Sequence, residues 1–281
     1  MSSSISVTKA EPYMIPVGHE DDIRLQTLAK ALPPRFLEIM KEKQIPTDAD
    51  ILDVGCGNGY LTACFAKAFP DAHFVGFDNS QQQLEVCGQR SQTNIVWENC
   101  DVYHLDELKE RYPRLFDVVH CRFVLNHLTD PTVAMDQLLQ VVKPGGLLIL
   151  QEASKDNYPE IHPRSIKAID AFWKMAEKQM ELQKTHLDTS ERLIKHITGR
   201  VKDLNVIKED VVVKGAEKKS TFRMSVEHYV KMLPEKGLSH LFKEIDYEDP
   251  QQWIKEMKKF EKDDSFSMVF KSFTTITAIK D

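Results

Sequence analysis

The chain has 281 residues and a formal net charge of −6, a length that allows one large α/β domain with additional helices. The acidic balance argues against a polyanionic partner bound over a broad surface, so we expect no nucleic-acid partner. No apolar run approaches the ~20 residues that span a bilayer, and the Met-Ser-Ser-Ser start lacks a signal-peptide pattern. We therefore expect a cytoplasmic protein without membrane contact.

The five cysteines are an odd number and show no Cys-x-x-Cys spacing. They fall mainly inside apolar segments, which favours free thiols in a reducing cytosol over disulfides or a zinc site. The sequence shows no metal-ligand pattern, so we expect no bound metal. The cysteines are Cys56, Cys64, Cys87, Cys100 and Cys121.

The N-terminal segment divides into a tail and a helical cap. Residues 1 to about 12 look flexible, and apolar residues at helical spacing follow them. Pro33-Pro34 separates two expected helices, and the cap ends near residue 45. A Tyr-x6-Glu-x3-Arg-Leu pattern begins at Tyr13 and includes Arg24. On this spacing alone, Arg24 is equally consistent with an ordinary surface arginine on an amphipathic helix.

The stretch from Ile51 to Tyr60 reads as a buried strand, a turn with alternating glycines and the start of a helix. Gly55, Gly57 and Gly59 permit backbone angles and close approaches that a Cβ would block, which indicates a ligand-binding turn. A dinucleotide fingerprint would need glycine at position 60, and a phosphate-binding loop would need a following Lys-Ser or Lys-Thr. Neither pattern is present. The alternative interpretation is a plain strand-turn-helix corner.

The second expected strand, over residues 73–78, ends in an acidic residue. Asp78 lies about 20 residues after Gly59, where a carboxylate can accept hydrogen bonds from both hydroxyls of a ribose. Because Asn79 and Ser80 follow, helix capping is the alternative role for Asp78. The two roles are compatible with each other.

Three more apolar segments continue the alternation of strands and helices. A strand over 94–98 precedes Asp101, a strand over 116–123 leads into a polar loop, and a Lys-Pro-Gly-Gly turn precedes the strand over 147–152. Strands and helices therefore alternate over residues 48–152, which predicts an α/β fold with a doubly wound, parallel sheet.

The second half of the chain is richer in helices. Residues 206–214 alternate as a sixth strand, and Met268 to Ile279 read as the final strand. Before the sixth strand, two amphipathic segments predict a helical insertion that we interpret as a lid. The expected organisation is a tail and helical cap over 1–45, a cofactor-binding core over 46–154, a helical lid over 155–200, and strands and helices over 201–281 that complete the same domain.

Residues 13 to 152 resemble the class I S-adenosylmethionine-dependent methyltransferases. The resemblance rests on Asp53 before the Gly-x-Gly-x-Gly turn, on Asp78 and Asp101, and on the Lys-Pro-Gly-Gly turn before a strand. It implies a mostly parallel, seven-stranded sheet whose antiparallel last strand lies beside the fifth. It also implies S-adenosyl-L-methionine as the cofactor and S-adenosyl-L-homocysteine as the product. The cofactor-binding residues that it implies are Tyr13, Arg24, Asp53, Gly55, Cys56, Gly57, Gly59, Asp78, Asn79, Asp101, Val102 and Phe123.

The resemblance also implies roles for several of these residues. Asp53 places a negative charge near the ammonium of the cofactor's methionine end, and Arg24 pairs with its carboxylate beside Tyr13. Asp101 accepts from the adenine amino group, and Val102 supplies a backbone N–H. An Asp after a strand is also common in turns, which is the alternative for Asp101.

Methyl transfer from a sulfonium requires the acceptor to be held in line and water to be excluded. A general base is needed only for a poorly ionised hydroxyl or a protonated amine, and His127 and Glu152 are the candidates. The alternative for His127 is packing or orienting its loop. Asn126 is a candidate for positioning the acceptor. An apolar acceptor pocket could be walled by Tyr158, Phe172 and Trp173, although packing of a lid helix on the sheet explains each of them as well.

The leading interpretation is a methyltransferase that acts on an oxygen or nitrogen atom of a small-molecule acceptor. The absence of an Asn/Asp-Pro-Pro-Tyr motif after the fourth strand argues against enzymes that methylate nucleobases or protein amides. Two alternatives stay open: methylation of a protein or RNA, and a module that binds S-adenosylmethionine without catalysis.

Overall fold

The structure is a computed structural model that describes residues 17–32, 34–113, 115–152, 154, 156, 158–245 and 249–281. Tyr13, to which the resemblance gave a place beside the cofactor, lies outside the described residues. Within these ranges, none of the helices combines the length and apolar character that a membrane crossing requires.

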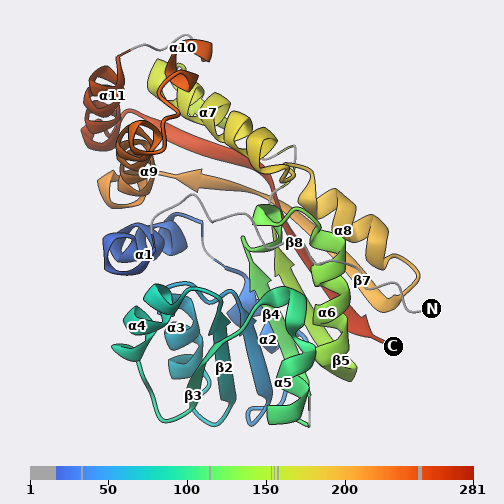
Figure 1. Ribbon diagram of the computed structural model, residues 1–281. Helices are drawn as coiled ribbons and strands as arrows, with labels where there is room; N and C mark the ends of the chain where they lie inside the picture. Colours follow the sequence, from blue (N-terminus) through green and yellow to red (C-terminus); the bar gives the residue numbers. More distant parts are fainter. Residues whose placement is uncertain are drawn as a thin grey trace, which may run out of the picture.

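One eight-stranded sheet runs through the molecule in the order β3-β2-β1-β4-β5-β8-β6, and β7 pairs with β8 outside this path (Figure 1). The first five strands along the chain are parallel, and β8 pairs antiparallel with β5. The predicted doubly wound α/β fold and the antiparallel last strand beside the fifth are therefore confirmed. The strands are β1 Asp50–Val54, β2 His73–Asp78, β3 Ile95–Asn99, β4 Phe116–Arg122, β5 Val142–Gln151, β6 Pro159–His162, β7 Val201–Val213 and β8 Ser267–Lys280.

Helices cover both faces of the parallel strands. Ile51 of β1 packs with α2 and α3, whereas its neighbour Leu52 packs with α5, α6 and α8 on the opposite face. Successive strand residues point to opposite faces, so a strand covered on both sides is apolar throughout. The helices of this part are η1 Gly18–Glu20, α1 Asp22–Ala31, α2 Phe36–Glu42, α3 Tyr60–Ala68, α4 Gln81–Gly88, η2 Val102–His104, α5 Asp106–Arg111, η3 Leu125–His127, α6 Pro131–Val141 and α8 Thr189–Ile197.

Strands β7 and β8 extend beyond the parallel strands and meet a second helical layer, drawn at the top of Figure 1. This upper layer has its own core of large buried side chains, including Phe222, Trp253 and Phe270. Strand β8 links the two parts, because Thr275–Ile279 pairs with β5 while Ser267–Phe270 pairs with β6. The helices of the upper layer are α7 Lys167–Gln183, α9 Ala216–Glu235, α10 Leu241–Glu244 and α11 Pro250–Lys262.

The stretch 155–200, predicted as a helical lid, contains β6, α7 and α8, and these elements pack in different places. Helix α7 contacts α11 and α10 in the upper layer, whereas α8 contacts α6 beside the sheet. Strand β6 is an eighth strand, which the expectation of seven does not include. The predicted sixth strand over 206–214 is present as the longer β7. The predicted domain boundaries stay predictions.

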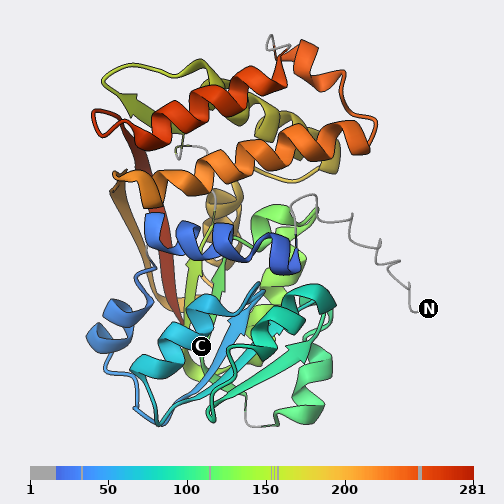
Figure 2. The same cartoon turned by 90° about the vertical axis from the view of Figure 1, so that its left-hand side faces the viewer.

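Helix α1, part of the predicted N-terminal cap, lies between the sheet and the upper layer (Figure 2). It contacts α9 above and α3 below. This position brings its side chains over the carboxyl ends of β1, β2 and β4, the edge at which open α/β sheets bind ligands. The cap is therefore one wall of the site.

Candidate functional site

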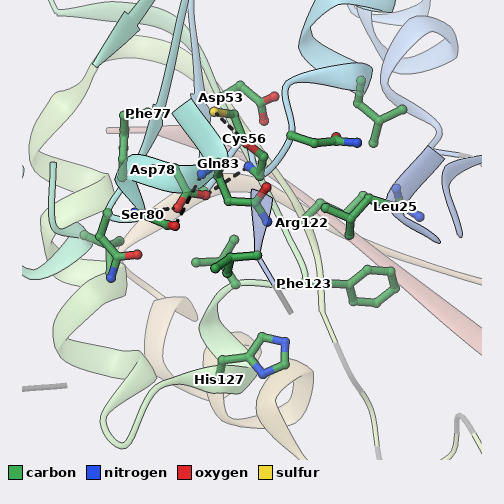
Figure 3. A pocket seen from close by; sticks show the side chains of 18 of the residues that line it. Leu25, Asp53, Cys56, Phe77, Asp78, Ser80, Gln83, Arg122, Phe123 and His127 are labelled. Carbon is green, nitrogen blue, oxygen red and sulfur yellow. Dashed lines mark hydrogen bonds between the residues drawn. The ribbon is translucent and has the colours of Figure 1, made fainter. Parts of the chain in front are cut away.

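A cavity of about 590 Å³ lies at the carboxyl ends of β1, β2 and β4 (Figure 3). Its volume is in the usual range for pockets that bind small molecules or cofactors. It collects many residues that the sequence singled out from different segments. Those that line it are Arg24, Asp53, Gly55, Cys56, Gly57, Asp78, Asn79, Val102, Phe123, Asn126 and His127.

The three glycines of the turn meet different surroundings. A Cβ at Gly55 would lie 2.4 Å from Cγ2 of Val124, and one at Gly59 would lie 2.7 Å from Cη2 of Trp97. At Gly57 the nearest atom would be Cδ1 of Leu25, at 3.5 Å. Packing inside the protein therefore explains two of the glycines. Gly57 has a φ of +56°, and its open side belongs to the cavity.

Asp78 joins the end of β2 to the glycine turn. Its carboxylate accepts a hydrogen bond from the backbone N–H of Gly57 at 2.9 Å and another from that of Ser80 at 2.9 Å. Burial raises the pKa of this carboxyl, although the backbone hydrogen bonds oppose the shift. Each oxygen keeps acceptor capacity toward the cavity, because a carboxylate offers about four lone-pair sites. Capping and ligand binding are therefore compatible at Asp78.

Asp53 is buried at the base of the turn, with a 5 % exposed surface that still lines the cavity. Its carboxylate accepts from the Thr62 hydroxyl and lies 2.8 Å from Nδ1 of His120. The His120 ring packs edge-on against both Phe36 and Phe65, whose rings stack on each other. This network fixes the orientation of Asp53, and His120 lines the cavity beside it.

Arg24 lines the cavity from α1, and its guanidinium binds an acidic neighbour. Its Nη2 donates to Oδ2 of Asp21 at 2.7 Å, and its Nε donates to the other oxygen of the same carboxylate. Asp21 is 1 % exposed, and burial is the main cause that raises the pKa of its carboxyl. The two-point contact is the geometry that arginine favours with carboxylates. It occupies the Nε and Nη2 edge of the Arg24 guanidinium.

Two positions that the sequence singled out, Gly59 and Asp101, are not part of the cavity lining. Gly59 supplies the start of α3, and Asp101 precedes η2, where its carboxylate accepts from the backbone N–H of Tyr103 at 3.0 Å. The residue after Asp101, Val102, does line the cavity. The capping role of Asp101 is thus visible in the structure, and its contact with a ligand stays a prediction.

Glu152 is fully buried and does not line the cavity. It accepts hydrogen bonds from the backbone N–H groups of Val124, Leu125 and Asn126, at 3.1, 3.0 and 3.2 Å. Burial raises the pKa of this carboxyl to about 7, and the three N–H donors act against that shift. The geometry favours a residue that positions the loop after β4 over one that touches a ligand.

His127 follows that loop and reaches the cavity itself. Burial, followed by the positive charge of Arg24, lowers the pKa of the imidazole to about 4. Its Nε2 lies 3.5 Å from the side-chain nitrogen of Asn126, which also lines the cavity. A neutral imidazole at this position has the protonation state that a general base requires.

The three aromatic residues predicted as acceptor walls lie away from the cavity lining. The ring of Phe172 packs edge-on against Tyr229 at 5.5 Å, and Trp173 packs against Phe270 at 6.0 Å. Tyr158 is 46 % exposed and lies 6.0 Å from the Trp173 ring. Their contacts are those of the upper core, and any contact with an acceptor stays a prediction.

Sequence reasoning missed several cavity residues, of which Arg122 has the most distinctive surroundings. It ends β4, where the prediction of a strand gave no reason to single out one polar residue. His120, from the same strand, is buried and also lines the cavity. Gln83 and Gln183 line the cavity from α4 and α7, and no local pattern marks either one.

In the part of the chain that the structure describes, no group of three or more His, Cys, Asp or Glu side chains is arranged to hold a metal ion. The five cysteines are free, and Sγ of Cys56 lies 4.0 Å from Sγ of Cys87. The acids of the cavity are instead engaged with backbone amides, a hydroxyl and an imidazole.

Comparison with known proteins identifies the family. A family model described as a methyltransferase domain matches residues 46–202, which is more than half of the chain. The chain belongs to the class I methyltransferases. The matched range contains the glycine turn, Asp78, Asp101 and the loop after β4, so the resemblance drawn from these motifs is confirmed.

Curated relatives match this chain over part of their length. A malonyl-[acyl-carrier protein] O-methyltransferase from Halalkalibacterium halodurans is 31% identical over 151 residues, which cover 52% of this chain and 52% of that protein. A ubiquinone biosynthesis O-methyltransferase from Neisseria meningitidis is 32% identical over 114 residues, covering 40% of this chain and 47% of the relative. The chain thus spans about half the length of the curated relatives it matches.

Solved structures agree on the fold. The YcgJ protein from Bacillus subtilis superposes with a TM-score of 0.53 at 16% identity, covering 86% of this chain and 96% of that protein. A protein from Bacillus halodurans C-125 gives a TM-score of 0.50 at 18% identity, covering 87% and 97% of the two chains. At these identities the likeness establishes the fold alone.

Proposed function

We propose that the protein transfers a methyl group from S-adenosyl-L-methionine to an oxygen or nitrogen atom of a small-molecule acceptor. The observation that carries this proposal is the cavity at the carboxyl ends of β1, β2 and β4, where Gly57 leaves an open backbone face between Asp53 and Asp78. Family membership supports the same reaction.

The residues of the cavity fit the parts of this cofactor. Asp78 has acceptor capacity for ribose hydroxyls, and the cavity lining at Val102 offers an apolar edge with a backbone N–H for the adenine. Asp53 supplies negative charge close to the glycine turn, which suits an ammonium group. The missing Cβ at Gly57 allows a ligand to approach the backbone closely.

When bound, the cofactor supplies an already activated methyl group, so the protein's task is to bind, orient and exclude water. The wall formed by α1 covers the cavity from above. His127 is neutral near pH 7 and can accept a proton from an acceptor hydroxyl or ammonium. Glu152 contributes indirectly, because it holds the backbone of the loop that precedes His127.

An oxygen acceptor is supported by the relatives, two of which are named as O-methyltransferases. The acceptor's own contacts are proposed at Asn126 and His127, the polar residues that the loop after β4 brings to the cavity. The small, partly closed cavity favours a small molecule over a polymer, since a protein or RNA substrate needs an exposed groove.

Two measurements test the proposal. Calorimetry with S-adenosylhomocysteine should show a single site per chain, and transfer of labelled methyl groups to a panel of phenols, carboxylates and amines should identify the acceptor class. Binding of the product together with turnover of a panel member is the expected result. Binding without turnover of any member would favour a non-catalytic module, and absence of binding would overturn the proposal.

A further inference from the structure

Arg122 is a half-buried cation that feels the charges of Asp53 and Glu152 at a distance but forms no direct ion pair among the described residues. No carboxylate of the described chain lies within 4.0 Å of its guanidinium. Its Nη2 donates to the carbonyl oxygen of Leu32 at the end of α1, while its Nε is buried without a hydrogen bond. A buried donor without a partner costs free energy, so its retention calls for an explanation.

The position of Arg122 places it at the glycine turn. In the β1–β4 register Val54 pairs with Cys121, so Gly55 and Arg122 leave adjacent strands at the same level. Both residues line the cavity, and Figure 3 shows Arg122 among its side chains. Because the glycine turn is the proposed site for the amino-acid end of the cofactor, the guanidinium lies beside the part of the cavity where an anionic group is expected.

The backbone after Arg122 is held in an uncommon conformation. Phe123 has a φ of +53°, although it is not a glycine, and its N–H is fixed by the carbonyl of Gln151 at 2.8 Å. This turn sets the Phe123 ring 4.9 Å from the Arg122 guanidinium carbon, a cation–π contact on the cavity wall. Strained residues of this kind cluster at ligand sites, and here the strain supports the orientation of Arg122.

Arg24, the arginine that the sequence favoured for this task, is engaged elsewhere. Both oxygens of the buried Asp21 carboxylate accept from it. Burial lowers the pKa of Arg122 to about 10, so its guanidinium still carries its charge at neutral pH. Of the two guanidinium groups on the cavity, only Arg122 lacks a carboxylate partner within the described ranges.

We propose that Arg122 is the carboxylate-binding residue of the cavity. This inference rests on the proposed function and refines it. The carboxylate has two possible sources: the amino-acid end of the cofactor, which the register with Gly55 favours, or an acidic acceptor. In either case the buried Nε–H receives the acceptor that it lacks among the described residues, and the guanidinium gains a carboxylate in direct contact.

The test compares S-adenosylhomocysteine with S-adenosyl-3-thiopropylamine, which differs from it by the loss of the carboxylate. Calorimetry should show that the wild-type protein prefers the first compound by about tenfold to a hundredfold, and that Arg122→Gln loses this preference. The affinity of the variant for the compound without the carboxylate should stay close to the wild-type value. If Arg122 only links β4 to α1, Arg122→Gln should instead lower the affinity for both compounds by the same factor.

A matched control removes the other guanidinium together with its partner. The double variant Asp21→Asn/Arg24→Gln keeps the net charge of the chain and should retain the preference for the carboxylate. Loss of the preference in this double variant, with retention in Arg122→Gln, would overturn the proposal in favour of Arg24.

The second source of the carboxylate is tested with an acceptor pair, 3,4-dihydroxybenzoate and 3,4-dihydroxybenzamide, bound to the complex with S-adenosylhomocysteine. A preference for the acid that Arg122→Gln abolishes supports the acceptor as the source. If Arg122→Gln changes discrimination in neither pair while the wild-type protein binds S-adenosylhomocysteine, the inference fails and the proposed function stands. If the wild-type protein binds neither cofactor analogue, the proposed function fails and this inference with it.

Discussion

The Asp78 carboxylate accepts a hydrogen bond from the backbone N–H of Gly57 at 2.9 Å, so the end of β2 holds the centre of the glycine turn. A second bond from the N–H of Ser80 places the same carboxylate at the start of α4. The residue proposed to bind ribose therefore also shapes the turn over which we propose that the cofactor lies. Its two roles can be separated, because they depend on different lone pairs.

We predict that Asp78→Ala lowers the affinity for S-adenosylhomocysteine by about tenfold to a hundredfold, since hydrogen bonds to a charged group are lost in the complex. The melting temperature should change by only a few degrees, because the lost contacts in the free protein are two backbone bonds on the surface of the cavity. Asp78→Asn keeps one acceptor oxygen, so its affinity for S-adenosylhomocysteine should lie between that of the wild-type protein and that of Asp78→Ala. Calorimetry and thermal unfolding measure both quantities; a large loss of stability with unaltered affinity would show that Asp78 is only a cap.

The features that the sequence predicted best are those encoded by neighbouring residues. The apolar strand before Gly55, the helix after Gly59 and the acid at the end of β2 follow from local spacing, and all appear in the structure. Their meeting at one edge of the sheet follows from the parallel order of the strands. The fold class and much of the cavity lining were therefore accessible without any coordinates.

The parts that could not be predicted depend on contacts between distant segments. Glu152 looked like a candidate base because it ends a strand, yet its oxygens are taken up by backbone amides of residues 124–126. Arg24 forms a two-point ion pair with Asp21 whereas Arg122 forms no direct ion pair within the described residues, a difference that no spacing reveals. Strand β6 is four residues long and pairs with β8 from the other end of the chain, so no local pattern marks it.

The contrast between the three glycines gives a second prediction. Gly55→Ala and Gly59→Ala each push a Cβ into a neighbouring side chain, at 2.4 and 2.7 Å, and should destabilise the fold by about 1 to 3 kcal/mol from overpacking. Gly57→Ala meets no such contact and should lose only the cost of its positive φ, about 1 to 2 kcal/mol, a cost that the other two variants incur in addition to overpacking.

For ligand binding we expect the opposite: substitution of Gly57 should have a larger effect on affinity than substitution of Gly55 or Gly59. Gly57→Val introduces a branched side chain on the cavity side and should abolish binding of S-adenosylhomocysteine in a protein that still unfolds cooperatively. Chemical denaturation and calorimetry on the same samples provide the measurement. Unchanged affinity in Gly57→Val would remove the glycine turn from the proposed site.

Glu152 supplies a third prediction, on pH. Its carboxyl has a pKa of about 7 in the folded protein, against 4.5 as the ordinary value. Between these values the folded protein holds a proton that the unfolded chain has released, so the free energy of unfolding falls as pH rises from 4.5 to 7. This contribution is fully present below pH 4.5 and is lost above pH 7.

Glu152→Gln removes the titrating group, and its free energy of unfolding should therefore decline less than that of the wild-type protein across the same window. Glu110→Gln, at an exposed position, serves as the control and should follow the wild-type curve. Urea unfolding at half-unit pH steps measures the slope. A Glu152→Gln curve parallel to the wild-type curve would contradict the assignment of this pH dependence to Glu152.

The fourth prediction concerns His127, whose imidazole has a pKa of about 4 through burial and the nearby charge of Arg24. The neutral form is the one that can accept a proton, so kcat should not titrate with this group between pH 6 and 9 and should fall only as pH drops toward 4. If His127 is the base, His127→Asn lowers kcat by about a hundredfold to ten-thousandfold while leaving the affinity for S-adenosylhomocysteine nearly unchanged. His73→Asn, on an exposed ring remote from the cavity lining, should match the wild-type rate. Full kcat in His127→Asn with the acceptor identified from the panel would assign His127 to packing of the loop and leave the reaction to proximity alone.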